Sequence, residues 1–399
     1  MNKGLSCCST FDGCCSQPPT TEDTGVGAGV RAGVEVEAGV DAGVGATIEN
    51  SVHESVRDYY GKVLQGKDDL KTSSCCCTEM PPAEIRDILP MIADEILDRF
   101  YGCGSPLPPL LEGMTVLDLG CGTGRDVYIA SKLVGESGRV IGVDMTTEQI
   151  EIASRYQEEQ HRRFGYRASN VQFLQGYIED LGSLGIKDNS VDVVISNCVI
   201  NLSPAKEQVF REIYRVLKPG GELFFSDIFS DRRIPESLRT DPMLHGECLS
   251  GVLYTEDFRR MMAKTGWNDF RYTSIRSLSL DSEEIESRLG FAAFSSRTVR
   301  AFKLDDLEDT CEDYGQVAYY DGSIPGYPHF FDLDDHHRFF TGKPLLVCGN
   351  TASMITNTRY GKAFKVIGDR SVHFGVFGGC TAESNADGDA CQSSASACC

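Results

Sequence analysis

The sequence is short of positive charge, and it has no long apolar run. Its 399 residues contain 38 lysines and arginines against 59 aspartates and glutamates, which gives a formal net charge of −21. An acidic chain of this kind is a poor candidate for binding the phosphates of nucleic acids. No uninterrupted apolar run reaches the roughly 20 residues that span a membrane. We therefore expect neither nucleic acid nor a membrane among the partners.

Targeting signals are also missing. The chain begins with MNKGLSCCST, which lacks the apolar core of a signal peptide. Asn2 excludes the myristoylation pattern, and the terminal Cys-Cys does not meet the general pattern for prenylation. The 17 cysteines are an odd number, and an odd number without a signal peptide favours a reducing cytosol. We therefore expect a cytoplasmic protein whose cysteines are thiols, ligands or redox pairs rather than a permanent disulfide framework.

Composition divides the chain into four parts. Residues 1–48 are rich in glycine, valine and alanine without an apolar face, so we predict a disordered tail. Residues 49–304 carry the periodic patterns of the main domain, including helical patterns at its N-terminal end. Residues 305–380 are aromatic and rich in turns, which predicts a small, mostly β domain. Residues 381–399 form a polar, flexible tail that contains cysteines.

Apolar runs alternate with helical patterns through the main domain. The predicted strands are Thr115–Leu119, Arg139–Val143, Val171–Leu174, Val191–Ser196 and Glu222–Ser226. The predicted helices are Arg125–Leu133, Glu148–Arg163 and Lys206–Val216, with two earlier helical patterns around residues 51–64 and 81–100, the second kinked at Pro90. This alternation predicts an α/β fold with a Rossmann-like, mostly parallel sheet covered on both faces. Later strands near 270–280 and 292–302 should add an antiparallel edge.

A glycine turn follows the first predicted strand, in the sequence LDLGCGTGRD. Its glycines let the backbone approach a ligand at the carboxyl end of that strand, where open α/β sheets bind their ligands. The spacing is G-x-G-x-G, and Arg125 occupies the place of the last glycine of a dinucleotide turn. Asp118 and Asp144 flank the turn. A pyrophosphate would be repelled by Asp118, whereas a cationic ligand with an amino acid end and a ribose would not.

The turns VLDLGCGTGRD, VIGVDMT and VLKPGGELFFSD resemble those of class I S-adenosylmethionine methyltransferases over roughly residues 113–227. The resemblance implies S-adenosyl-L-methionine as the cofactor. It implies that Asp144 accepts both ribose hydroxyls and that Met145 flanks the adenine. The residues that we expect to contact the cofactor are Tyr101, Asp118, Gly120, Gly122, Gly124, Asp144, Met145, Ile178, Glu179 and Asn197.

Four cysteines of the main domain are candidates for chemistry: Cys75, Cys103, Cys198 and Cys248. Each has a structural alternative, because a free cysteine is often only a small buried hydrophobe. His245 and Cys248 could begin a zinc site, but no second pair of ligands follows them. Cys198 ends the fourth predicted strand, and Cys248 follows the fifth. Since the carboxyl ends of these strands share one rim of the sheet, the two cysteines can meet above the cofactor.

The sequences around these cysteines resemble the arsenite S-adenosylmethionine methyltransferases. The matching stretches are DYYGKVLQGKDDLKTSSC, RFYGCG, GYIEDLG, SNCVINL and HGECLSGVLY. The resemblance implies that Cys103, Cys198 and Cys248 bind arsenic(III) and that Cys75 is a further essential thiol. Because the family has one cysteine where this chain has three, Cys76 could replace Cys75.

The chemistry agrees with that resemblance, because trivalent arsenic is a soft centre and soft centres select thiolates. The expected substrates are arsenite or its thiol conjugates, and then methylarsenite. Methyl transfer oxidises arsenic to the pentavalent state. Cys75 and Cys103 could reduce it again by forming a disulfide, which thioredoxin or glutathione would reopen.

Two other functions remain open at the level of the sequence. Another class I methyltransferase, acting on carbon or oxygen of a small metabolite, would need a base near the cofactor. A thiol-rich protein that sequesters metalloids would use adjacent cysteine pairs, such as those at 7–8, 14–15 and 398–399.

Overall fold

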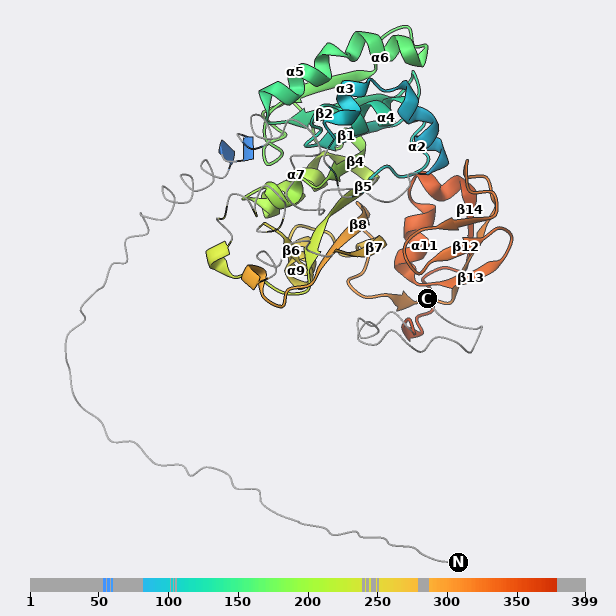
Figure 1. Cartoon of the computed structure of the whole chain (residues 1–399). Coiled ribbons are helices and arrows are strands. Elements are labelled where there is room, and N and C mark those ends of the chain that lie inside the picture. The colour runs from blue at the N-terminus through green and yellow to red at the C-terminus, as the bar shows by residue number, and fades with distance from the viewer. Residues whose placement is uncertain are drawn as a thin grey trace, which may run out of the picture. The chain divides into compact units, whose positions relative to one another are not determined.

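The computed structural model in Figure 1 describes the main body of the chain. The described residues are 53, 54, 56, 57, 59, 82–100, 102, 104, 106–238, 241, 244, 249, 251–278 and 287–378. The predicted tails and most of the first predicted helix lie outside them, as do Cys75, Tyr101, Cys103 and Cys248. Within the described part, no helix is both long enough and apolar enough to cross a membrane.

A mostly parallel sheet forms the centre of the main domain, as predicted. Its strands are β1 (Thr115–Leu119), β2 (Arg139–Asp144), β3 (Val171–Gln175), β4 (Val191–Asn197), β5 (Leu217–Ser230), β6 (Leu253–Tyr254), β7 (Arg271–Leu278) and β8 (Phe294–Phe302). They follow the order β3-β2-β1-β4-β5-β8-β7, and β6 pairs with β5. The first five strands are parallel, whereas β8 pairs antiparallel with both β5 and β7. The predicted antiparallel edge is therefore confirmed.

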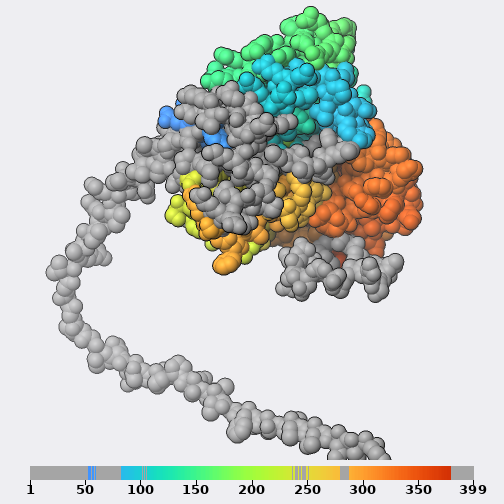
Figure 2. Space-filling view, viewed as in Figure 1, coloured from blue at the N-terminus to red at the C-terminus, as the bar shows by residue number. Residues whose placement is uncertain are grey.

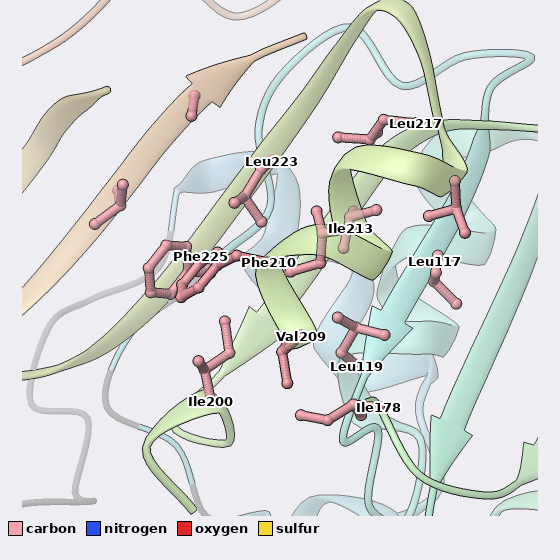
Figure 3. Close-up of a cluster of buried hydrophobic side chains, with 14 of the residues drawn as sticks. Leu117, Leu119, Ile178, Ile200, Val209, Phe210, Ile213, Leu217, Leu223 and Phe225 are labelled. Carbon is pink, nitrogen blue, oxygen red and sulfur yellow. The ribbon is translucent and has the colours of Figure 1, made fainter. Parts of the chain in front are cut away.

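Two apolar clusters cover the two faces of this sheet. On one face, α7 (Lys206–Val216) and α9 (Thr255–Lys264) pack against β1 and β5. Figure 3 shows Val209, Phe210 and Ile213 of α7 pointing toward Leu117 and Phe225 of the sheet. On the other face, α4 (Arg125–Val134) packs with the helices that precede β1. Both faces are thus buried, as a parallel sheet requires.

The helices agree with the predictions except in two details. The predicted helix over 148–163 is divided at Tyr156 into α5 (Thr147–Arg155) and α6 (Gln157–Phe164). The Tyr156 hydroxyl lies 2.6 Å from a carboxylate oxygen of Glu95. The kink predicted at Pro90 is a complete interruption. It gives α2 (Ala83–Ile88), the 3₁₀ turn η4 (Leu89–Met91) and α3 (Asp94–Asp98), because proline lacks the N–H that a helix interior uses.

The C-terminal part is mostly β, as predicted, but it also contains a helix. Its strands are β9 (Glu312–Asp313), β10 (Gln316–Tyr320), β11 (Phe330–Asp332), β12 (Arg338–Phe340), β13 (Pro344–Val347), β14 (Phe364–Ile367) and β15 (Gly375–Val376). They form three small antiparallel sheets. Helix α11 (Gly349–Thr356) and the 3₁₀ turn η7 (Arg359–Ala363), which the sequence did not predict, pack with these strands on a separate apolar cluster. Figure 2 shows their surface as one orange region.

A buried polar network joins this C-terminal part to the sheet. Glu222 of β5 is fully buried and accepts a hydrogen bond from Nε of Arg300 in β8 at 2.7 Å. Arg359 of η7 forms an ion pair with the other oxygen of Glu222, and the Tyr360 hydroxyl lies 3.3 Å from that oxygen. The network therefore joins β5 and β8 of the sheet to η7, which follows Glu222 by more than a hundred residues.

Candidate active site

A pocket lies at the carboxyl ends of β1, β2 and β4, where open α/β sheets bind ligands. Nine of the residues predicted for the cofactor or for arsenic line this pocket. They are Asp118, Gly120, Gly122, Asp144, Met145, Ile178, Glu179, Asn197 and Cys198. These residues come from separate strands and loops, so the fold brings together what the sequence predicted to be together.

The glycine turn passes directly beneath the pocket. Gly120 and Gly122 have φ angles of 72° and 52°, in the left-handed region that favours glycine. A Cβ atom on Gly120 would lie 2.3 Å from Cγ2 of Val199. Gly124 has a φ of 88° and caps α4, and a Cβ there would lie 2.9 Å from the ring of Phe173. Gly124 does not line the pocket, so its contact with the cofactor stays a prediction.

Asp144 is held in a fixed orientation at the end of β2. Its Oδ2 accepts a hydrogen bond from the N–H of Gly122 at 2.9 Å, and its Oδ1 accepts one from the N–H of Thr146 at 2.8 Å. Burial raises the pKa of Asp144, and these backbone hydrogen bonds oppose that rise. A carboxylate oxygen can accept more than one hydrogen bond, so both oxygens are still able to accept the hydroxyls of a ligand.

The pocket contains more carboxylates than its arginines neutralise locally. Asp118 is only 3% exposed. Burial raises its pKa well above the usual value, and the charges of Asp126 and Asp144 raise it further. Asp126 is paired with Nη1 of Arg125 at 2.6 Å and accepts a hydrogen bond from Nδ2 of Asn197 at 3.0 Å. A positively charged ligand beside Asp118 would lower this electrostatic cost, since it favours the ionised carboxylate.

Glu179 has a partner that the sequence analysis missed. Its Oε1 lies 3.2 Å from Nε2 of His53 and accepts a hydrogen bond from the Ser203 hydroxyl. Burial opposes ionisation of Glu179, but the hydrogen bonds from His53 and Ser203 outweigh it and hold the pKa below the usual value. The ring of His53 also lies 4.6 Å from that of Tyr177. His53 precedes Glu179 by more than a hundred residues, so no local pattern indicates the pair.

Cys198 stands out by its backbone. It is one of three described non-glycine residues with a positive φ, which is 55°. Such conformations cost energy and concentrate at functional sites. The residue is 4% exposed, its N–H donates to the Ser226 carbonyl at 2.8 Å, and its sulfur is disulfide-bonded. A disulfide requires the sulfur of a second cysteine beside it.

The loop that carries Cys198 is anchored from behind. The 3₁₀ turn η5 (Ile200–Leu202) follows it directly. Asn201 in this turn donates its N–H and its side-chain amide to Asp227 of β5, at 3.1 Å and 2.7 Å. Burial raises the pKa of Asp227 to about 7, although backbone hydrogen bonds from Ile228 and Asn201 oppose the rise.

Other lining residues were also absent from the sequence-based set. They are His53, Phe100, Asp126, Gln149 and Cys121 among others. Phe100 packs under the guanidinium of Arg125, with 3.9 Å between the guanidinium carbon and the ring centroid. Asp126 and Cys121 belong to the glycine turn itself, so closer attention to that motif could have found them. The roles predicted for Cys75, Cys103, Cys248 and Tyr101 concern residues outside the described part, and they stay predictions.

Comparison with known proteins identifies relatives over nearly the whole main body. Residues 110–266 match the family described as "Methyltransferase domain", and residues 313–399 match "Arsenite methyltransferase C-terminal domain". The chain is 51% identical to an arsenite methyltransferase of Aquipseudomonas alcaligenes over 345 residues, which cover 86% of this chain and 99% of that protein. It is 41% identical to the arsenite methyltransferase of Homo sapiens over 332 residues, covering 82% and 86% of the two chains.

A solved structure points to the same family. An arsenic(III) S-adenosylmethionine methyltransferase from Chlamydomonas reinhardtii superposes with a TM-score of 0.73 at 51% identity. The match covers 75% of this chain and 100% of that one.

Proposed function

The chain belongs to the arsenite methyltransferase family, and we propose that it methylates trivalent arsenic held by cysteine sulfurs in the pocket described above. It is an S-adenosylmethionine-dependent methyltransferase by that membership. The proposal concerns the substrate of this chain, its sulfur ligands and the course of the reaction.

One observation carries the proposal: Cys198 lies in the wall of the cofactor pocket. Its strained backbone is held by Ser226, and its sulfur is bonded to a second cysteine sulfur. A position where two sulfurs meet beside the cofactor suits a soft trivalent centre, which selects thiolates. A methyltransferase acting on carbon or oxygen has no need of such a cysteine.

The chemistry follows from the properties of arsenic. Arsenite loses hydroxide to thiols as water, and the arsenic keeps one lone pair. When bound, S-adenosylmethionine would supply a methyl group on its sulfonium sulfur. The arsenic lone pair would take this methyl group, which would leave the sulfur as the thioether of S-adenosylhomocysteine and the arsenic pentavalent. Arsenic has no proton to lose, so this step requires no general base.

The residues of the chain contribute binding and position. We propose that Asp144 accepts the ribose hydroxyls and that Asp118 provides negative charge for the cationic cofactor; both residues line the pocket. We propose that the product is reduced by two cysteine thiols, which become a disulfide, with Cys75 and Cys103 as the pair. Thioredoxin or glutathione then reopens this disulfide by thiol exchange. In this proposal the protein works in the cytosol and serves arsenic detoxification.

Serine variants test the sulfur ligands. A trivalent arsenic that already carries one methyl group has two exchangeable bonds, so two thiolates hold it. We expect Cys198→Ser and Cys248→Ser to abolish methylation of both arsenite and methylarsenite, because a hydroxyl is a poor ligand for a soft centre. Cys75→Ser and Cys103→Ser should stop turnover of arsenite and keep part of the activity on methylarsenite. Methylated products are counted for each variant and substrate.

The control for this experiment is Cys391→Ser, which removes a thiol from the predicted C-terminal tail. It should leave both activities at the wild-type level, and all variants should still bind S-adenosylmethionine by calorimetry. Wild-type methylation of methylarsenite by Cys198→Ser would place the two-thiolate site elsewhere. Stoichiometric arsenic binding without any methylated product from the wild-type chain would favour sequestration instead.

A further inference from the structure

Cys311 and Cys348 form a pair of cysteines in the C-terminal part of the chain, outside the cofactor pocket. Cys311 precedes β9, and Cys348 immediately precedes α11. Both carry thiols rather than a disulfide, and the two side chains are hydrogen-bonded to each other. Neither lines the cofactor pocket, and methyl transfer as proposed above makes no use of them.

The arginine beside these thiols contacts both of them. Nη2 of Arg271, the first residue of β7, lies 3.5 Å from the sulfur of Cys311 and 3.9 Å from that of Cys348. The same nitrogen donates to Asp269 at 2.7 Å. Arg271 is 6% exposed, and its Nε has no hydrogen-bond partner in the described part of the chain. The guanidinium therefore keeps an unused donor in a buried position, which normally demands an acceptor.

The remaining neighbours fix Cys348 in place. Its sulfur accepts from the N–H of Thr351 at 3.4 Å and lies 3.2 Å from the Thr351 hydroxyl. That hydroxyl lies 3.4 Å from Nε2 of His337, whose Nδ1 contacts Asp334 at 2.7 Å. Cys348 is fully buried, whereas Cys311 is partly exposed, so a small molecule reaches the pair from the side of Cys311.

We propose that Cys311 and Cys348 form a dithiol site that binds trivalent arsenic outside the cofactor pocket. Arsenite loses two hydroxyls in this step. Two arsenic–oxygen bonds break, two arsenic–sulfur bonds form, and the two thiol protons leave with the hydroxyls as two waters. No electron is transferred. The one hydroxyl left on arsenic offers an acceptor to the guanidinium of Arg271.

Charge at this place favours a neutral metalloid over a divalent cation. The guanidinium of Arg271 contacts both sulfurs and opposes a divalent cation bound directly to them, although Asp269 and Asp334 pair with the same guanidinium. The hydrogen bond from Cys311, together with burial, raises the pKa of the Cys348 thiol, so the thiolate that a zinc ion needs is disfavoured. Arsenite is an uncharged acid that exchanges with protonated thiols. Neither reactant has to become charged in the buried site.

The nearby cluster of Asp334, His336 and His337 is not a competing metal site. Its ligand atoms lie within 4.8 Å of one another. However, Asp334 already accepts hydrogen bonds from the N–H groups of His336 and His337 and contacts Nδ1 of His337. It also faces Arg271 at 3.9 Å. The carboxylate oxygens of Asp334 are thus already occupied by groups of its own turn and by Arg271.

Differential alkylation of the full chain tests the site. The protein is reduced with a phosphine, incubated with arsenite and treated with iodoacetamide, and the modified peptides are then quantified. We expect alkylation of Cys311 to slow roughly tenfold when arsenite is present at about ten times its Kd. The protection should be reversed by a dithiol and not by an equal concentration of a monothiol, because two bonds to one arsenic must be displaced together.

Two variants make the test decisive. Cys348→Ser should remove the protection of Cys311, because one thiol holds arsenic weakly. Ser353→Ala, a buried change in α11, the helix that follows Cys348, removes no sulfur and should retain the protection. Equal alkylation of wild-type Cys311 with and without arsenite would overturn the proposal, as would full protection in Cys348→Ser. If Cys348→Ser does not fold, Cys348→Ala serves in its place.

The proposal rests on the proposed function only for the identity of the metalloid. Formation of methylated arsenic by the wild-type chain is measured in parallel. Its absence would contradict the proposed function, whereas the protection of Cys311 is read independently of it.

Discussion

Asp144 and Asp227 show how much depends on single carboxylates in this protein. Asp144 lines the pocket at the carboxyl ends of β1, β2 and β4 and is oriented by the N–H groups of Gly122 and Thr146. Asp227 lies behind the pocket, is fully buried and holds the turn that follows Cys198 through Asn201. Asp144 can therefore contact a ligand in the pocket, whereas Asp227 holds the turn that follows Cys198.

The substitution Asp144→Ala should weaken S-adenosylmethionine binding without unfolding the protein. Hydrogen bonds to a charged acceptor contribute about 1.5–3 kcal/mol each, so the loss of two hydroxyl contacts should reduce affinity at least about a hundredfold. Calorimetry measures the affinity. Glu148→Ala, which removes an exposed carboxylate in the first turn of α5, is the control and should bind normally. Unchanged affinity in Asp144→Ala would contradict the assignment of this residue to the cofactor.

Asp227 should make the stability of the protein depend on pH. Its pKa in the folded state is about 7, raised by burial, whereas an unfolded aspartate titrates near 4. Between these values the folded state binds more protons than the unfolded state. The free energy of unfolding should therefore fall as pH rises from about 4 to about 7, by up to about 1.4 kcal/mol per pH unit.

This pH dependence can be isolated with Asp227→Asn, which cannot titrate. Urea unfolding of the wild type and the variant is compared at several pH values across this window. As pH rises through this window, the free energy of unfolding of the wild type should fall relative to that of Asp227→Asn. A difference that is independent of pH would show that Asp227 does not titrate in this range.

At the scale of elements, the glycine turn and the loop after β4 depend on each other. The turn can pass beneath the pocket only because Gly120 leaves room for Val199, the residue after Cys198. The loop is held from its other side by Asp227 and by the Ser226 carbonyl. The glycine turn and the loop after β4 thus pack as one unit, and a change in one should displace the other.

Gly120→Ala should therefore impair both stability and cofactor binding. Gly165→Ala is a matched control, since both glycines have a positive φ, 72° and 79°, and only Gly120 of the two has an atom within 4 Å of the added methyl group. The two variants share the strain of a positive φ, and Gly120→Ala adds an overpacking cost of about 1–3 kcal/mol. Urea unfolding and calorimetry with S-adenosylmethionine measure these effects. Equal losses of stability in the two variants would argue against the packing of Val199 on the turn.

At the scale of the whole molecule, the C-terminal part is tied to the sheet by buried charge. Glu222 lies between Arg300 and Arg359, and the Arg300 guanidinium also donates to the carbonyl of Leu333. Arg359 donates to the Pro109 carbonyl at 3.0 Å, just before the sheet begins. Removal of the single anion would leave two buried cations without compensation.

Glu222→Ala should therefore destabilise the protein by about 3–5 kcal/mol, the cost of breaking a buried ion pair. Glu207→Ala is the control. Glu207 also pairs with two cations, Arg211 and Lys264, but on the exposed surface of α7. Its loss should cost less than about 1 kcal/mol. The two free energies of unfolding come from urea titration. Similar small effects for both would mean that the buried network does not join the C-terminal part to the sheet.

The sequence by itself determined the elements of the main domain and the kind of ligand that it binds. Apolar periodicity and turn chemistry are local, so the predicted central strands agree with β1 to β4 within one residue at either end. The turns VLDLGCGTGRD, VIGVDMT and VLKPGGELFFSD are local patterns, and their resemblance to class I methyltransferases indicated the cofactor. β5 extends beyond its prediction on both sides, because its ends pair with neighbouring strands rather than following their own apolar pattern.

Only the tertiary structure decided which distant residues meet. His53 reaches Glu179, Val199 covers Gly120, Glu222 pairs with Arg359, and Cys311 contacts Cys348 beside Arg271. None of these pairs shares a local pattern, because each is formed when separate elements pack together. The strained backbone of Cys198 is likewise imposed by the packing around it. The sequence specifies local conformation and residue chemistry, whereas long-range packing determines which of those chemistries can act together.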